Sequence, residues 1–206
     1  MVHIEFLVEE LSAEEALKYL LPKILPQDVS YQLHSYNGKD DLLRKLPSRL
    51  KAYKRWIPSS HKIVVLIDQD GKKCVRIKKD LEQIAIAAGL STKTSSQGLS
   101  FQVLNRIAIE ELEAWFFGDI PAVIAAYPVV PQNLDKKAAF RNPDAIRGGT
   151  WEKLEKVLQK AGFFTAGMQK TNAASEISKH MDPKRNQSKS FQIFVSGLRA
   201  LLICDI

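Results

Sequence analysis

Two aspartates separated by one residue form the sharpest chemical feature of the sequence. Asp68 and Asp70 follow the apolar run KIVVLI, and Gly71 comes directly after them. In an extended segment, side chains two residues apart point to the same side, so both carboxylates can aim at one point, and the glycine lets the chain turn. Converging carboxylates repel each other in a half-buried crevice unless a cation joins them, and oxygen ligands favour Mg²⁺ or Mn²⁺. The pair therefore predicts a divalent-metal site.

Further carboxylates follow two other apolar runs. Glu9 and Glu10 come after HIEFLV, and Glu110 and Glu113 come after FQVLNRIAI. If a helix begins at Glu110, these last two share one of its faces, although the helix dipole alone also favours acidic residues there. We expect the three groups to converge on Mg²⁺ or Mn²⁺. The predicted metal ligands are Glu9, Glu10, Asp68, Asp70, Glu110 and Glu113.

The positive charge is concentrated in one part of the chain. The formal net charge is +7, and residues 39–79 contain 13 Lys and Arg against 4 Asp. A local excess of this kind is typical of a surface that binds nucleic acid or polyphosphate, and it also suits a solvated helix face. The candidates for contacts with nucleic acid are Lys39, Arg44, Lys45, Arg49, Lys72, Arg106, Arg141 and Arg147.

Three of these arginines have two interpretations each. Arg141 and Arg147 precede Gly148-Gly149 and a helix that is predicted to start near Thr150. Such a segment can bind phosphate at a helix N-terminus, and a plain loop is the alternative. Arg106 lies on or next to the last apolar run, where its guanidinium can hold a phosphate or pair with a carboxylate.

The elements that must position these residues alternate between strand and helix in the first half of the chain. The run KIVVLI is continuous and rich in β-branched residues, which is typical of a central parallel strand. Leucines at helical spacing predict a helix around Pro47, with a kink or two abutting helices at the proline. The predicted strands cover residues 3–8, 29–36, 62–67 and 101–109. The predicted helices cover residues 40–56, 74–88, 110–117, 119–127, 150–161, 169–181 and 188–203, after a first helix that follows Ser12.

This order of elements predicts an α/β fold: a mostly parallel, Rossmann-like sheet with helices on both faces and a C-terminal helical extension. We expect residues 1–118 to form the α/β domain and residues 119–206 to pack on it as one compact unit. In parallel sheets, ligands bind outside the carboxyl ends of the strands, near a switch in strand order. The acidic groups all follow predicted strand ends, so the fold and the metal site are consistent with each other.

The composition argues against several classes of protein. No run approaches the roughly 20 apolar residues of a membrane span, and the N-terminal MVHIEFLVEE lacks the pattern of a signal peptide. The two cysteines and four histidines are scattered along the sequence, which argues against a zinc site. We therefore expect a cytoplasmic protein with reduced thiols and no membrane partner.

Several segments resemble known proteins. A strand that ends in Glu, with a later apolar strand that ends in Asp-x-Asp, resembles the Toprim domain of topoisomerases, bacterial primases and overcoming-lysogenization-defect nucleases. Nearly the whole chain resembles an uncharacterised Toprim-like bacterial family that is often found beside ATPases of the AAA or ABC type. The segments that carry this resemblance are LVEELSAEE at 7–15, KDDLLRKLP at 39–47, VVLIDQDG at 64–71, NRIAIEELEAWFFGD at 105–119, RNPDAIRGGTWEKLEKVL at 141–158 and HMDPKRNQSKSFQIF at 180–194.

The resemblance implies a Toprim-like sheet in which Glu9, Asp68 and Asp70 are metal-dependent catalytic residues. The Toprim pattern has glycine after the glutamate, whereas Glu10 stands there in this sequence, so either carboxylate can be the ligand. Topoisomerases and primases need partner domains for which these residues leave no room. The resemblance thus implies Mg²⁺-dependent hydrolysis of phosphodiester bonds in nucleic acid, by a nuclease that can serve as the effector of an antiphage defence pair. The alternatives are a nucleotide phosphohydrolase and a non-enzymatic binding subunit of an AAA- or ABC-type ATPase complex.

Overall fold

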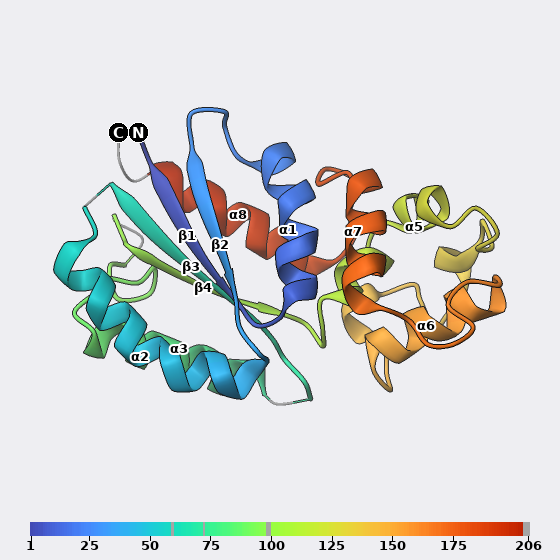
Figure 1. The fold of residues 1–206 in the computed structure, drawn as a ribbon, viewed down its shortest axis with the longest axis horizontal. Coiled ribbons are helices and arrows are strands. Elements are labelled where there is room, and N and C mark those ends of the chain that lie inside the picture. Colours follow the sequence, from blue (N-terminus) through green and yellow to red (C-terminus); the bar gives the residue numbers. More distant parts are fainter. Residues whose placement is uncertain (59, 72, 98–99, 204–206) are drawn as a thin grey trace. The chain divides into compact units, whose positions relative to one another are not determined.

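The computed structural model describes residues 1–58, 60–71, 73–97 and 100–203. Among these residues, strands alternate with helices as far as β4, and only helices follow it (Figure 1). The strands are β1 (His3–Val8), β2 (Ser30–Ser35), β3 (His61–Asp68) and β4 (Val103–Ala108). The helices are α1 (Leu11–Ile24), α2 (Lys39–Trp56), α3 (Cys74–Ala87), α4 (Glu113–Phe117), α5 (Ile120–Ala126), α6 (Thr150–Lys160), α7 (Lys170–His180) and α8 (Lys189–Ile203), with short 3-10 turns η1 (Leu134–Lys136) and η2 (Pro143–Ala145).

The strands form one parallel sheet in the order β2-β1-β3-β4. The register pairs Val8 of β1 with Ser35 of β2 on one side and with Leu66 of β3 on the other. The chain therefore runs outward from β1 to β2 and then crosses back to β3, so the strand order switches between β1 and β3. The carboxyl ends of strands at such a switch border the usual ligand crevice of an open parallel sheet. The predicted α/β fold, with its parallel sheet, flanking helices and helical C-terminal part, is confirmed.

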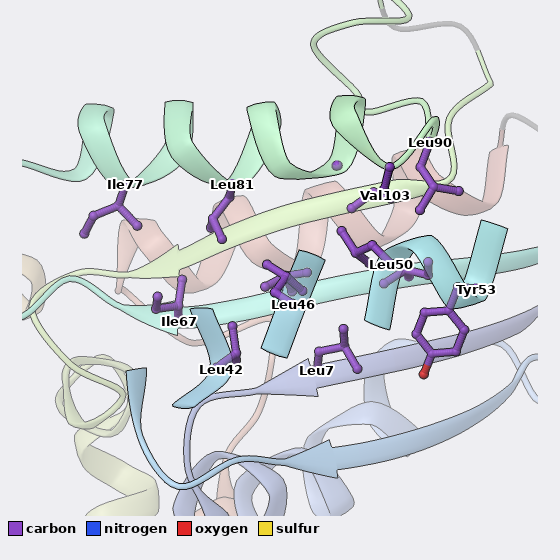
Figure 2. Packing of buried hydrophobic residues seen from close by; sticks show 14 residues of the cluster. Leu7, Leu42, Leu46, Leu50, Tyr53, Ile67, Ile77, Leu81, Leu90 and Val103 are labelled. Atoms are coloured by element: carbon purple, nitrogen blue, oxygen red, sulfur yellow. The ribbon is translucent and has the colours of Figure 1, made fainter. Parts of the chain in front are cut away.

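A hydrophobic core joins one face of the sheet to α2 and α3 (Figure 2). Leu42, Leu46 and Leu50 follow one another at about one helical turn along α2, and Ile77 and Leu81 do the same on α3. Figure 2 shows these side chains directed toward the strands. Burial of each stabilises the fold by about 1.5–3 kcal/mol. The opposite face of the strands is also buried, through Ile4, Phe6, Val8, Val64, Leu66 and Leu104.

The chain divides into two compact units, each of which is discontinuous in sequence. Unit 1 contains the sheet and consists of residues 1–11, 25–107 and the chain from Phe194 onward. Unit 2 is helical and consists of Ser12–Ile24 and Ala108–Ile193. The sequence predicted a division into residues 1–118 and 119–206, whereas unit 2 takes in most of α1 and a second segment that begins at Ala108. Packing between segments distant in sequence, rather than chain order, defines these units.

Two helices differ from the sequence prediction. α2 is one helix that continues through Pro47, rather than two abutting helices. Its leucines are held in the core on both sides of the proline, and this packing offsets the hydrogen bond that proline cannot donate. α4 begins at Glu113, because residues 109–112 form bends and a turn. The prediction that Glu110 and Glu113 share a helix face is therefore wrong.

Candidate functional site

The candidate site lies in unit 1, where β1 and β3 end at the switch in strand order. Glu9 follows β1, and Asp68 is the last residue of β3. The Oε2 atom of Glu9 accepts a hydrogen bond from the backbone N–H of Asp68, at 3.0 Å. Glu9 is 7% exposed, so its carboxylate is buried at the carboxyl edge of the sheet rather than exposed to solvent. Two of the predicted catalytic residues are thus brought together.

The third predicted catalytic residue lies in a sharp turn directly after β3. Asp70 has φ 51° and Gly71 has φ 67°, and this left-handed conformation is costly for aspartate and ordinary for glycine. Lys39 Nζ donates a hydrogen bond to Asp70 Oδ2 at 2.5 Å. Asp70 is largely accessible, whereas Lys39 is buried. A predicted metal ligand and a predicted phosphate contact therefore form an ion pair at this site.

The loop after β2 positions Lys39. The backbone N–H of Gly38 donates to the carbonyl oxygen of Glu9 at 3.0 Å, and Gly38 adopts φ 87°, which favours glycine. Tyr36 N–H donates to the carbonyl oxygen of Val8 in the same way, at 3.0 Å. These bonds place the start of α2, of which Lys39 is the first residue, beside the end of β1.

The electrostatic surroundings of Glu9 are unfavourable for its negative charge. Burial raises the pKa of Glu9 above its ordinary value, and the Asp70 and Glu10 carboxylates raise it further. The hydrogen bond from Asp68 and the charge of Lys39 oppose this rise but do not cancel it. A buried carboxylate that faces other carboxylates is under-compensated, which is characteristic of functional sites and is relieved by a bound cation.

The donor set of the site is made of carboxylate oxygens, which Mg²⁺ and Mn²⁺ prefer. Among the residues that the structure describes, no group of three or more His, Cys, Asp or Glu residues is arranged to hold a metal ion. Mg²⁺ is commonly bound by one or two carboxylates, with water and substrate phosphate oxygens completing its coordination. As arranged in this structure, Glu9, Asp68 and Asp70 do not form a ready-made metal site, and an ion held by one or two of them together with phosphate oxygens stays a prediction.

The predicted ligands after β4 belong to unit 2, whereas Glu9 and Asp68 belong to unit 1. Glu113 is 3% exposed and lies in the first turn of α4. Glu110 is half-buried and precedes that helix. A contribution of Glu110 or Glu113 to the metal site stays a prediction.

Glu111, which lies between Glu110 and Glu113, has a structural role. Glu111 Oε2 accepts hydrogen bonds from Thr150 N–H, Thr150 Oγ1 and Trp151 N–H at 2.8, 2.9 and 2.9 Å. A carboxylate in this position satisfies the first donors of α6 and interacts favourably with its dipole. The donors that a phosphate would need at this helix N-terminus are therefore already used. The loop with Arg147 is better explained as a structural loop than as a phosphate-binding one, and contact of Arg141 or Arg147 with nucleic acid stays a prediction.

Three predicted nucleic-acid contacts share one exposed surface on α2. Arg44, Lys45 and Arg49 line a shallow surface pocket together with Tyr36. Arg44 and Lys45 pair with Asp41 at 2.5 and 2.8 Å, which aligns their side chains along the helix. We call this set of three cations the α2 basic surface. Its cations outnumber its single paired carboxylate, so it retains net positive charge for a polyanion.

Arg106 is held inside unit 1. Its Nη1 atom donates to the carbonyl oxygen of Asn105 at 2.9 Å, and its guanidinium packs against Gly197 of α8. A Cβ at Gly197 would lie 2.3 Å from the Nη2 atom, so a larger residue there would displace the arginine side chain. Burial lowers the pKa of Arg106, and Glu82 opposes this effect. The structure thus gives Arg106 a packing role. Lys72 lies outside the described residues.

The sequence did not reveal a pocket that adjoins the carboxylates. The pocket has a volume of about 610 Å³ and lies between the first turns of α2 and α3. Because these helices follow β2 and β3, their N-termini lie at the carboxyl edge of the sheet, as the carboxylates do. The lining residues are Lys39, Leu43, Lys73, Arg76, Ile77 and Asp80. Spacing along one helix cannot indicate such a pocket, because two helices contribute to it.

Three of the four histidines, although scattered along the sequence, lie close together in the structure. His34 Nε2 lies 2.5 Å from Glu5 Oε2, His3 Nε2 lies 3.4 Å from Glu5 Oε1, and the His3 and His61 rings are 4.9 Å apart. Tyr53 Oη also donates to Glu5, at 3.1 Å. Burial acts to raise the pKa of Glu5, but the histidines and the tyrosine outweigh it and lower the pKa. The parallel register, which pairs His3 with His61, creates this cluster.

A family model described as a domain of unknown function, DUF4276, matches residues 8–199. The chain belongs to the DUF4276 family. The match runs from the end of β1 into α8 and includes Glu9, Lys39, Asp68 and Asp70. No curated protein and no solved structure is a significant match to the chain. In the described part of this DUF4276 protein, no helix is both long enough and apolar enough to cross a membrane.

Proposed function

We propose that this DUF4276 protein is a Mg²⁺-dependent nuclease of the Toprim type, which hydrolyses phosphodiester bonds in nucleic acid. The observation that carries the proposal is the approach of Glu9 to Asp68 where β1 and β3 end, with Asp70 two residues further on. This edge is where parallel α/β sheets bind their ligands. A glutamate after the first strand and Asp-x-Asp after a later central strand also form the pattern that resembles Toprim domains.

Glu9, Asp68 and Asp70 are the residues that would hold Mg²⁺ or Mn²⁺. Such an ion, when bound, activates water and stabilises the leaving oxygen in phosphodiester cleavage. The protein supplies the positioning. The Asp68 N–H orients the Glu9 carboxylate, and Lys39 holds Asp70 at the rim of the site. Because Glu9 is buried and surrounded by acidic groups, its interaction with a cation is stronger than that of an exposed carboxylate.

The α2 basic surface supports a nucleic-acid substrate over a small nucleotide. Exposed cations along a helix attract a polyanion over several phosphates and speed its association. A single nucleotide would not contact both the carboxylates of the site and the three cations along α2. The ATPase partner that the resemblance implies stays a prediction.

The direct test is cleavage of labelled single- and double-stranded DNA and RNA in the presence of Mg²⁺ or Mn²⁺. We expect Asp68→Asn/Asp70→Asn to lower the rate by roughly 100-fold or more, because metal ligands are lost. The matched control is Asp28→Asn/Asp135→Asn, which removes two exposed carboxylates elsewhere and should keep the wild-type rate. Metal-dependent cleavage that survives in the Asp68/Asp70 variant would contradict the mechanism.

A second readout does not depend on turnover. Mn²⁺ titrated into the wild-type protein should raise its unfolding temperature, because the ion binds the folded state. The Asp68→Asn/Asp70→Asn variant weakens the ion pair of the buried Lys39, so it should be no more stable than the wild type without metal, and it should not respond to the ion. Identical responses of both proteins would show that these carboxylates bind no metal.

A further inference from the structure

The pocket between α2 and α3 combines charges that suit a phosphate. Lys39, Lys73 and Arg76 line it together with one carboxylate, Asp80, so the lining has a net positive charge. In the described part of the chain, Lys73 and Arg76 form no ion pair that would neutralise them. Its volume of about 610 Å³ lies within the range of pockets that bind small ligands, roughly 300–1,000 Å³.

The same pocket has an apolar wall. Ile77 is 7% exposed and belongs to the core between α3 and the sheet, and Leu43 packs against that core from α2. A phosphate ion alone gains nothing from apolar surface, whereas the sugar and base of a nucleotide do. The lining therefore matches a whole nucleotide, with the phosphate toward the cations and the sugar and base toward Leu43 and Ile77.

Lys39 joins this pocket to the carboxylate site. Its side chain lines the pocket, and its Nζ atom donates to Asp70 Oδ2. Only 8% of the Lys39 side chain is exposed, so it is confined between the pocket and the carboxylate site. A phosphate near the Lys39 ammonium is consequently also near Asp70.

We propose that the pocket binds one nucleotide of a single nucleic-acid strand, next to the phosphodiester at the carboxylates. The statement about cleavage rests on the proposed function, and the statement about binding does not. A pocket between two helices receives a nucleotide only if its base is unstacked and unpaired, because the opposite strand of a duplex would hold the base away. The substrate class is therefore single-stranded nucleic acid, at an end, a loop or a flap.

The test measures binding of a short, 3′-labelled oligothymidylate by fluorescence anisotropy in EDTA, where cleavage cannot occur. Lys73→Gln/Arg76→Gln should weaken binding by about tenfold or more, because charge-assisted hydrogen bonds to phosphate are lost. The matched control, Lys79→Gln/Arg199→Gln, removes the same two charges from exposed positions outside the pocket. The control should weaken binding by less than about threefold at moderate salt.

A second variant distinguishes the contribution of the pocket's apolar space from that of its charge. Leu43→Trp fills the apolar side while keeping every cation, and it should weaken binding about as much as the Lys73/Arg76 variant, with thermal unfolding as the check on folding. A duplex of the same length should bind at least about tenfold more weakly than the single strand. Binding by both pocket variants equal to that of the control, or tight binding of the duplex, would overturn the proposal. If the pocket variants lose binding and the wild type cleaves nothing with Mg²⁺, the nuclease function fails and the pocket stands.

Discussion

Buried carboxylates in the two units have very different surroundings. In unit 2, Asp119 is 1% exposed and accepts hydrogen bonds from Arg185 Nε and Nη2 at 2.7 and 2.9 Å and from the N–H of Asp182 at 2.8 Å. In unit 1, Glu9 is similarly buried, accepts the Asp68 N–H, and faces the Asp70 carboxylate. Burial alone therefore does not distinguish the two residues; their partners do.

Other acidic residues of unit 2 follow the pattern of Asp119. Glu111 caps α6, and Asp144 accepts hydrogen bonds from Ser188 Oγ, Ser190 N–H and Ser190 Oγ at 2.7, 2.8 and 3.1 Å at the start of α8. A buried carboxylate with several donors stabilises the fold, whereas one left beside like charges costs stability and is a candidate for function. Asp119, Glu111 and Asp144 thus have structural roles in unit 2, whereas Glu9 stays a candidate for function.

The largest effect should come from removing the best-bonded carboxylate. Asp119→Ala leaves the Arg185 guanidinium and the Asp182 N–H without their acceptor, so we expect the free energy of unfolding to fall by about 3 kcal/mol. Urea denaturation measures this loss. The control is Glu176→Ala, which removes only an exposed ion pair with Lys179 and should change stability little. A loss of stability no larger than that of Glu176→Ala would contradict the structural role of Asp119.

A smaller loss is expected at the cap of α6. Glu111→Ala removes an acceptor of three hydrogen bonds at a helix N-terminus, so the free energy of unfolding should fall by about 2 kcal/mol. Glu110→Ala, at the half-buried neighbouring position, is the matched control and should cost less than about 0.5 kcal/mol. Equal losses of unfolding free energy in urea denaturation would mean that Glu111 does not stabilise the N-terminus of α6.

The smallest effect, with the opposite sign, is expected at Glu9. Because its pKa is raised above the ordinary 4.5, the folded protein binds a proton more tightly than the unfolded chain, and stability falls as the pH rises above that value. Glu9→Gln removes this fall, so the variant in EDTA at neutral pH should match the wild type or exceed it by up to about 1 kcal/mol. Urea denaturation of both proteins between about pH 4 and about pH 8 measures this difference in the free energy of unfolding.

Glu5 is the internal control for that sign. Its pKa is lowered, so its contribution to stability is present above 4.5 and is lost as the pH falls through the lowered value. Glu5→Gln should therefore destabilise the protein at neutral pH, and its difference from wild type should shrink in acid. If Glu9→Gln and Glu5→Gln shift stability in the same direction at neutral pH, the electrostatic contrast between the two glutamates is wrong.

The fold class and one edge of the candidate site could be predicted from the residue pattern alone. Apolar runs such as KIVVLI are covered only when both faces of a strand are buried, which is typical of a parallel sheet with helical connections. Once those strands are parallel, carboxylates that follow them lie at the same edge, as Glu9 and Asp68 do. The helices after β4 followed from their periodicity, except that α4 begins at Glu113 because residues 109–112 turn.

The partner of each charged group could not be predicted in this way, because it depends on contacts between elements distant in sequence. Lys39 and Asp70 are 31 residues apart, and Glu111 and Thr150 are 39 apart. The histidines met around Glu5 because of the register between strands, and Arg106 was enclosed because Gly197 leaves room for it. Periodicity within an element tells which side chains share a face, but contacts between elements depend on register, packing and the turns that join them. The same kind of residue thus became a helix cap in one unit and a candidate metal ligand in the other.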